Sequence, residues 1–321
     1  MRINIEQKGE LTLPDELLQN LRTVHGASVD SWLSGLGSLL KDVLDSRDAH
    51  LAPGDPPLSY HLVFFAEQAS GAEITVKCTV PSWEQRPEVA GVVALSDAGI
   101  GPELCWSDLD RGILIMKRVR PGATMPTALP SLVDDARITR GVATLAAGMA
   151  RDVIVGDRQD DLVPVRYYTR ALEDVNRSSS LWSEHRDDVQ RALELRNALL
   201  AAADHRDVFL HGDLHHYNIL QNNDQRWSVI DPKGLFGPSG YEFGAFTYNP
   251  VGIQYHPELA TLTRQRVDIW SEVTGIPWET VRSWGYVAAM LSACWSAEDS
   301  GKGWLGAMTI AGTLRDIEPV R

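Results

Sequence analysis

The chain has 321 residues, of which 44% are hydrophobic and 23% charged, a composition typical of a globular protein with one large or two modest domains. Its net charge of −13 argues against a nucleic-acid binder, which needs a clustered basic face; an acidic field would suit a cationic substrate or simply aid solubility. The polar N-terminus and the absence of a long apolar window predict neither a leader nor a membrane span, so we expect no membrane partner and a cytoplasmic location.

The first part of the chain alternates between helical and strand patterns. Apolar residues recur at helical spacing through residues 14–50, which predicts helix there. Alternating patterns then predict strands and one more helix in a fixed order: strands 60–67 and 73–80, helix 82–98, strands 103–107 and 112–117. This order indicates a small lobe built on an antiparallel sheet.

After Pro121 the periodicity becomes mainly helical. Helices are expected at 132–150, 187–203, 257–274 and 278–298. Short strand-like runs interrupt them at 208–210, 218–220 and 227–230. Three widely spaced cysteines, Cys78, Cys105 and Cys294, lie in apolar or aromatic contexts and are interpreted as reduced core residues.

The loop between these strand-like runs carries the chemistry. Segment 211–218 (HGDLHHYN) places Asp213 and Asn218 five residues apart, and Asp231 follows an apolar run thirteen residues further. A kinase catalytic loop has this order: one Asp receives or orients the attacking hydroxyl, and an Asn and a later Asp bind magnesium through oxygen. The sequence therefore predicts Asp213 as the catalytic residue and Asn218 and Asp231 as metal ligands.

Segment 211–218 has a plainer interpretation, a turn in which Asp213 bonds its own backbone. An isolated motif would favour that interpretation, but here the loop, the Asn spacing and the second Asp occur in the right order. His211 is interpreted as a buried, hydrogen-bonded scaffold residue rather than as a proton carrier.

With residues 230–234 (IDPKG), segment 211–218 resembles the aminoglycoside phosphotransferase superfamily, whose fold is similar to that of the protein kinases. Longer segments resemble the streptomycin 6-kinase and hydroxyurea phosphotransferase branch of that superfamily. They are 230–242 (IDPKGLFGPSGYE), 248–250 (YNP), 262–266 (LTRQR) and 293–299 (ACWSAED). The resemblance is strong over 209–299, moderate over 72–122 and faint over the first 50 residues.

The resemblance implies an α+β, bilobal, protein-kinase-like fold. A small antiparallel-sheet lobe that binds the nucleotide would occupy residues 1–120. A larger helix-rich lobe with the catalytic loop and the acceptor site would occupy residues 121–321. The implied cofactors are ATP and Mg²⁺.

The family's nucleotide lysine falls on Lys77, in the alternating strand 74–78. Its acidic partner should lie on the next helix, where Glu88 is chosen because Val92 and Leu95 share its helical face, with Glu84 as the second choice. An exposed strand lysine is the alternative interpretation of Lys77.

The linker between the lobes, whose backbone binds adenine in this fold, maps to Met116, Lys117, Arg118 and Val119. One departure from the family is clear, because no glycine-rich phosphate loop is recognisable between residues 51 and 65. Residues 57–60 are the candidates for covering the phosphates instead.

The resemblance implies a phosphotransferase acting on a hydroxyl of an aminoglycoside, an aminocyclitol or an amino sugar, a small-molecule partner alongside the nucleotide. The candidate acceptor residues are Glu242, Asn249, Trp295, Glu298 and Asp299. Carboxylates near an indole could bind ammonium or guanidinium groups. Equally, the tryptophan could belong to the core and the last two carboxylates to a solvated helix end.

Other functions stay open at this point. A metabolic sugar kinase such as a glucosamine kinase fits the same resemblance. A non-catalytic pseudokinase is favoured by the missing glycine loop but disfavoured by the intact Lys77, Asp213, Asn218 and Asp231. A dinuclear-metal phosphoesterase gains support from His215 and His216 but lacks a second ligand block elsewhere in the chain.

Overall fold

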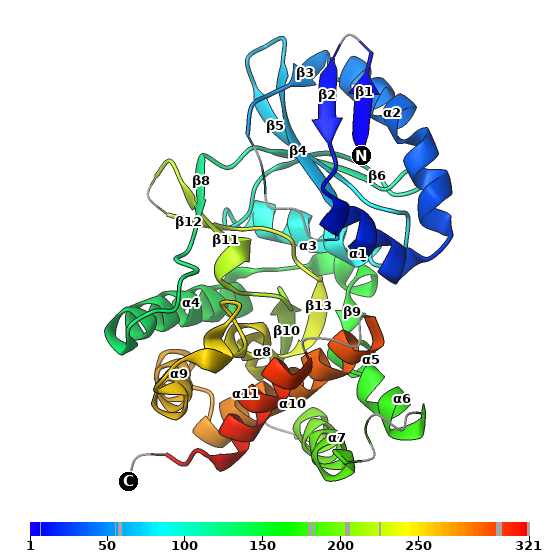
Figure 1. Cartoon of the computed structure of the whole chain (residues 1–321). Coiled ribbons are helices and arrows are strands. Elements are labelled where there is room, and N and C mark those ends of the chain that lie inside the picture. The colour runs from blue at the N-terminus through cyan, green and yellow to red at the C-terminus, as the bar shows by residue number, and fades with distance from the viewer. Residues whose placement is uncertain are drawn as a thin grey trace.

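The computed structural model describes residues 1–6, 8–54, 56, 60–178, 182, 184–202, 206–224, 226–299 and 304–319, with the side chains of 175–178, 298 and 299 excepted. The chain is bilobal, with a sheet-bearing N-terminal lobe above a larger helical lobe (Figure 1). One hydrophobic core cluster runs from Ile3 to Ile115 and a second from Ala90 to Leu314. No helix among these residues is long and apolar enough to cross a membrane.

The N-terminal lobe is built on a five-stranded antiparallel sheet in the order β3-β4-β5-β7-β6. Its elements are β1 (Arg2–Ile5), β2 (Gly9–Thr12), α1 (Asp15–His25), α2 (Ser28–Ser46), β3 (Ala49–Leu51), β4 (Leu62–Gln68), β5 (Glu73–Cys78), α3 (Gln85–Asp97), β6 (Leu104–Asp108) and β7 (Ile113–Lys117). On β5, Ile74 and Val76 are buried in the core cluster, while Lys77 lies opposite Val63 of β4 and Leu114 of β7. The alternation of the strand therefore sends Lys77 to the face away from Val76.

The prediction of helix through residues 14–50 is wrong in two places. Gly26, with φ of 60°, ends α1 and separates it from α2, and the chain is already extended from Ala49 in β3. The first hairpin, β1–β2, gives no signal because its four-residue strands are too short for a periodic pattern.

The C-terminal lobe places one long helix, α10, among the others, where it packs against α7, α8, α9 and α11. Its elements are β8 (Pro121–Thr124), α4 (Leu132–Asp152), β9 (Val163–Pro164), α5 (Val165–Tyr168), α6 (Ala171–Ser178), α7 (Arg186–Ala201), β10 (Asp207–Leu210), β11 (Ile219–Asn222), β12 (Trp227–Val229), β13 (Leu235–Pro238), α8 (Gly244–Thr247), α9 (Leu259–Thr274), α10 (Trp278–Asp299) and α11 (Trp304–Asp316). The predicted helices at 132–150, 187–203, 257–274 and 278–298 correspond to α4, α7, α9 and α10. Two three-stranded sheets, β10-β13-β9 and β12-β11-β8, complete this part of the chain.

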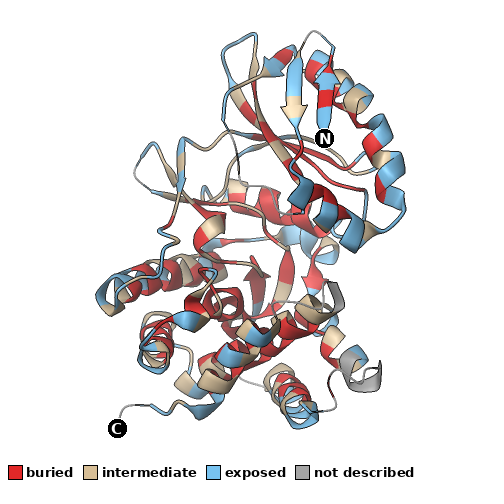
Figure 2. Cartoon of the chain, viewed as in Figure 1, coloured by how far each residue is buried: buried red, intermediate tan, exposed pale blue. Residues whose placement is uncertain are grey.

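Helix α3 belongs to the first lobe by sequence but packs on the second, and most of it is buried (Figure 2). A Cβ on Gly91 would lie 2.9 Å from Cγ of Pro232, and a Cβ on Gly234 would lie 1.9 Å from the carbonyl oxygen of Pro87. Glycine is therefore needed at both positions for α3 to approach the segment that follows Asp231 this closely.

The cysteine prediction needs one correction. Cys78 and Cys294 are buried, as expected, but Cys105 is exposed. It lies on β6, an edge strand of the sheet, where its side chain leaves the core.

Candidate active site

The loop between β10 and β11 is fixed by His211. Its Nδ1 accepts the backbone N–H of Asp213 at 3.2 Å, so its Nε2–H donates to the carbonyl of Ile230 at 2.8 Å. Burial lowers the pKa of His211 to about 4, which keeps the ring neutral. The residue therefore holds the loop against the strand end that precedes Asp231, in the scaffold role expected from its position.

Asp213 is oriented by a histidine that sequence reasoning did not select for this role. Nε2 of His215 lies 3.3 Å from Oδ1 of Asp213, while its Nδ1 accepts the N–H of Tyr217 at 3.3 Å. Burial disfavours the Asp213 carboxylate, but His215, Lys233 and His211 together outweigh that cost and hold its pKa below the usual range. Asp213 is therefore ionised at neutral pH.

Asn218 and Asp231 stand next to this carboxylate. Nδ2 of Asn218 donates to the carbonyl of Asp213 at 2.9 Å, which leaves its Oδ1 for a cation. The N–H of Ile230 donates to the carbonyl of Asn218 at 3.0 Å, so Asp231 follows directly beside the loop. Asp231 has φ of 59°, a left-handed conformation that is uncommon outside glycine and is often found at functional sites.

Lys77 joins the two lobes. Its Nζ lies 2.6 Å from Oε1 of Glu88 and 3.0 Å from Oδ1 of Asp231, and the side chain is only 3% exposed. Burial alone would lower the pKa of Lys77, but the two carboxylates more than reverse this and raise it. The partner on α3 is Glu88, whereas Glu84 is exposed at the start of the helix.

Two more basic side chains face this group. Electrostatic interactions connect Lys233 with Asp213, Glu84, Glu88 and Asp231, and these carboxylates raise its pKa against the effect of burial. His61 precedes β4 and interacts with Lys77 and Asp231; its buried Nδ1 has no hydrogen-bond partner among the described residues. Residues 57–59, predicted to cover the phosphates, lie outside the described part of the chain.

The predicted linker, residues 116–119, begins with the last two residues of β7. Met116 is buried, Lys117 is exposed, and Val119 is partly buried. The N–H groups of Lys117 and Arg118 already donate to the carbonyls of Glu103 at 2.9 Å and Glu73 at 3.1 Å.

Glu242 lies beneath the catalytic loop. Its Oε2 accepts the N–H of His211 at 2.7 Å and its Oε1 accepts the N–H of Gly212 at 3.0 Å. Burial raises the pKa of Glu242 to about 7, although these two bonds oppose the shift. Both oxygens are thus used by the loop backbone, which makes Glu242 a support of the loop in this structure.

The other predicted acceptor residues differ in their burial and contacts. Asn249 is buried, and its Nδ2 donates to the carbonyl of Ala245 at 2.9 Å. Trp295 is partly buried and packs edge-on against Tyr168 with 5.2 Å between ring centroids. The side chains of Glu298 and Asp299 lie outside the described residues.

Two tyrosines that sequence reasoning did not select lie in segments that pack near the catalytic loop: Tyr168 packs edge-on against Tyr241, and Tyr248 follows Phe246, on which His216 stacks. Burial, followed by the Asp213 carboxylate, raises the pKa of both Tyr168 and Tyr248. Tyr248 is also the one residue in 241–250 that is partly exposed rather than fully buried. Its place next to Asn249 in the YNP segment was a usable signal, whereas nothing local marks Tyr168.

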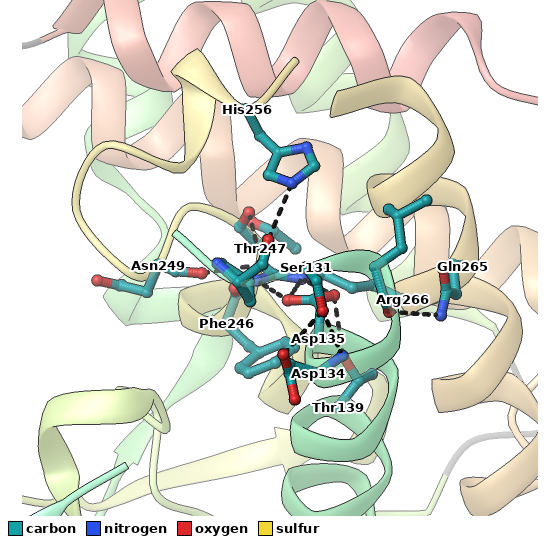
Figure 3. Close-up of polar contacts among 12 residues, drawn as sticks. Ser131, Asp134, Asp135, Thr139, Phe246, Thr247, Asn249, His256, Gln265 and Arg266 are labelled. Carbon is teal, nitrogen blue, oxygen red and sulfur yellow. Dashed lines mark hydrogen bonds and ion pairs between the residues drawn. The ribbon is translucent and has the colours of Figure 1, made fainter. Parts of the chain in front are cut away.

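Two buried arginines hold the backbone near these tyrosines. Arg266 of α9 binds Asp135 of α4 and donates to carbonyls on either side of Tyr248 (Figure 3). Arg196 of α7 donates to Oγ1 of Thr169 and to the carbonyl of Arg166, on either side of Tyr168. Within the part of the chain that the structure describes, no three His, Cys, Asp or Glu side chains form a metal-ligand cluster.

Comparison with known proteins identifies what the chain is similar to. Residues 59–300, about three quarters of the chain, match the family model described as aminoglycoside/hydroxyurea antibiotic resistance kinase. A streptomycin 6-kinase of Streptomyces glaucescens is 24% identical over 94% of this chain and 97% of that protein. A hydroxyurea phosphotransferase of Kitasatospora aureofaciens is 26% identical over 89% of this chain and 81% of that protein.

A solved structure is similar at the level of the fold. The choline kinase LicA from Streptococcus pneumoniae superposes with a TM-score of 0.61 at 10% identity, over 88% of this chain and 99% of that one. The bilobal architecture is therefore that of the kinase-like phosphotransferases.

Proposed function

The chain belongs to the aminoglycoside/hydroxyurea antibiotic resistance kinase family, and we propose that it transfers the γ-phosphoryl group of ATP to a hydroxyl of an aminoglycoside, aminocyclitol or related amino sugar. The observation that carries the proposal is the contact of Lys77 with both Glu88 and Asp231, beside a loop that presents Asp213 and Asn218. One ammonium, one amide and three carboxylates thus converge between the lobes.

Lys77 is the residue for the α- and β-phosphates. Its buried ammonium is held in place by Glu88, so phosphate oxygens meet a preorganised cation. Adenine would bind the linker 116–119; because the N–H groups of Lys117 and Arg118 are engaged, Val119 is the candidate donor there.

Asn218 and Asp231 suit Mg²⁺. Oδ1 of Asn218 and the second oxygen of Asp231 supply the hard oxygen ligands that this ion takes, and the left-handed backbone at Asp231 turns its carboxylate toward Lys77. When bound, Mg²⁺ would neutralise charge on the phosphates. The small number of protein ligands fits an ion that keeps water and phosphate oxygens as its other ligands.

Asp213 orients the acceptor hydroxyl. The acceptor oxygen forms a bond to the γ-phosphorus, the bond from that phosphorus to the bridging oxygen of ADP breaks, and the hydroxyl proton passes to the carboxylate. Because the pKa of Asp213 is held low, it is a weak base, and it takes the proton late, after the forming bond has acidified the hydroxyl. Lys233, which interacts electrostatically with Asp213 and Asp231, is the candidate for stabilising the transferred charge.

The acceptor side of Asp213 is aromatic, with Tyr168, Tyr248 and Trp295. Aromatic faces bind protonated amines by cation–π attraction and pack against the apolar faces of sugar rings. The net charge of −13 favours the approach of cationic acceptors to the molecule as a whole.

The test is ADP release from ATP and Mg²⁺ with a panel of streptomycin, other aminoglycosides, aminocyclitols, glucosamine and hydroxyurea. We expect turnover with at least one aminoglycoside or aminocyclitol, and Asp213→Asn should reduce kcat by about 10² or more. The matched control is Asp224→Asn, on the exposed turn before β12. Turnover with glucosamine alone would assign a metabolic kinase. Nucleotide binding without turnover would assign a pseudokinase.

A further inference from the structure

We propose that Tyr168 and Tyr248 form the acceptor-binding wall, and that two buried arginines, Arg196 and Arg266, are positioning residues that set these tyrosines against Asp213. The inference rests on the proposed function and adds what determines acceptor recognition. It also accounts for two family-like segments without an assigned role, 248–250 and 262–266.

Arg266 makes a full set of contacts around Tyr248. Its guanidinium donates to the carbonyls of Phe246 at 2.9 Å, Thr247 at 3.4 Å and Asn249 at 2.8 Å. Nε and Nη2 bind the Asp135 carboxylate at 2.9 Å and 2.6 Å (Figure 3). Arg266 thus holds the carbonyls of the two residues before Tyr248 and of the one residue after it.

The same guanidinium is connected to the catalytic loop through the ring of Phe246. It lies 4.5 Å from the centre of the Phe246 ring, and the ring of His216 stacks on Phe246 with centroids 5.0 Å apart and planes 5° apart. His216 is three residues from Asp213 and fully buried. The position of the Tyr248 segment is therefore coupled by direct packing to the loop that carries Asp213.

Arg196 repeats this arrangement around Tyr168. Its Nε donates to Oγ1 of Thr169 at 2.7 Å, its Nη2 donates to the carbonyl of Arg166, and its Nη1 binds Glu173. Thr169 Oγ1 in turn donates to the carbonyl of Val165 at 2.8 Å. Arg196 is 2% exposed and Arg266 is 1% exposed. Both guanidinium groups have therefore lost their contacts with water, and these hydrogen bonds replace them.

The two tyrosines share their surroundings. Both are partly exposed. Tyr168 packs edge-on against Tyr241, next to Glu242, whose carboxylate accepts the N–H groups of His211 and Gly212. Tyr248 lies two residues after Phe246, on which His216 of the catalytic loop stacks. Tyr168 packs edge-on against Trp295 at 5.2 Å, while Tyr248 bonds the side chain of Ser292 on the same helix, α10. Such a wall presents ring faces and phenol oxygens next to an anionic carboxylate, which suits a polyhydroxylated ring that bears a protonated amine.

The choice of arginine is specific. A planar guanidinium can bridge a carboxylate and several carbonyls at once, whereas a lysine at either position keeps the charge but offers one ammonium point. Lysine substitutions therefore test positioning without removing charge.

The experiment measures kcat, both KM values and Tm for Arg266→Lys and Arg196→Lys with the panel acceptor of lowest KM. We expect the acceptor KM to rise about tenfold or more while the ATP KM stays within about twofold, because the misplaced wall contacts only the acceptor. The matched control is Arg282→Lys, whose Nη1 binds the carbonyl of Leu314 at 3.0 Å, away from both tyrosine segments. It should leave both KM values unchanged.

A double-mutant cycle separates positioning from general loosening. If Arg266 acts through Tyr248, Arg266→Lys adds little to the acceptor KM of Tyr248→Ala, whereas Arg282→Lys combines with it additively. Should a lysine variant fail to fold, Tyr168→Ala and Tyr248→Ala alone still decide the matter, since both side chains are partly exposed.

An unchanged acceptor KM in both tyrosine variants overturns the inference, as does a rise in the two KM values together in the lysine variants. Wild-type turnover combined with either outcome leaves the proposed function standing. No wild-type turnover with any panel member overturns both.

Discussion

Nζ of Lys77 and Oδ1 of Asp231 lie 3.0 Å apart although 154 residues separate them in the chain. The contact brings a strand of the small lobe to the end of a strand in the large one. With Glu88 at 2.6 Å, the ammonium is shared between two carboxylates that come from different parts of the sequence. The proposed nucleotide site therefore exists only when both lobes are in place.

The first prediction concerns this ammonium. Lys77→Met should raise the KM for ATP by about tenfold or more, because a preorganised cation is lost from the phosphate site. The acceptor KM should change little. Lys41→Met, which removes an exposed pair with Asp45 on α2, is the control and should leave kinetics unaltered. An ATP KM within twofold of wild type would remove Lys77 from the site.

The second prediction concerns the metal. Asp231→Asn should increase the Mg²⁺ concentration for half-maximal rate by about tenfold or more, because an anionic ligand becomes neutral. A titration of Mg²⁺ at saturating ATP and acceptor measures the shift. A wild-type Mg²⁺ dependence in this variant would be incompatible with Asp231 as a ligand.

The third prediction follows from Glu242, whose pKa is about 7 in the folded chain because of burial. Its unfolded value is about 4.3, so between these values the folded state binds more protons and stability falls as pH rises. The loss should be about 3 kcal/mol between pH 4 and pH 7, then level off at higher pH. Urea unfolding across this range, compared between wild type and Glu242→Gln, measures it. An identical pH slope in both proteins would contradict the assignment.

The fourth prediction compares two ion pairs that join the same helices, α4 and α9. Asp135→Ala leaves the guanidinium of Arg266 buried without a counter-ion and should cost about 3 kcal/mol or more. Glu272→Ala breaks the exposed pair with Arg140 and should give no resolvable change in Tm. Thermal unfolding of both variants measures the difference. Equal Tm values would show that the buried pair contributes no more to stability than the exposed one.

How much the sequence could predict depends on the range of the contacts. Asp213 and Asn218 lie in one loop, so their spacing already places them together. Helical periodicity favours Glu88 over Glu84 as the partner of Lys77, and the structure shows the Lys77–Glu88 ion pair. Such relations are local or repeat with a known period.

Contacts made by irregular segments could not be foreseen in this way. The polar side chain of Asn249 makes it a candidate for binding the acceptor, but that side chain is buried and bonds the carbonyl of Ala245, while the neighbouring Tyr248 is partly exposed. No periodic rule fixes side-chain direction outside helices and strands. Glu242 is predicted near the acceptor, but its bonds to the N–H groups of residues 211 and 212 could not be predicted, because they join segments 30 and 31 positions apart.

The close packing of α3 on the large lobe bears on product release. Gly91 and Gly234 let this helix pack closely on the segment that follows Asp231, so we expect α3 and Glu88 to stay with the large lobe. We expect the five-stranded sheet to lift away instead, carrying Lys77 off both carboxylates at once. The rate of ADP release would then depend on how strongly this one ammonium binds its two carboxylates. Substitutions in the sheet would therefore change kcat first.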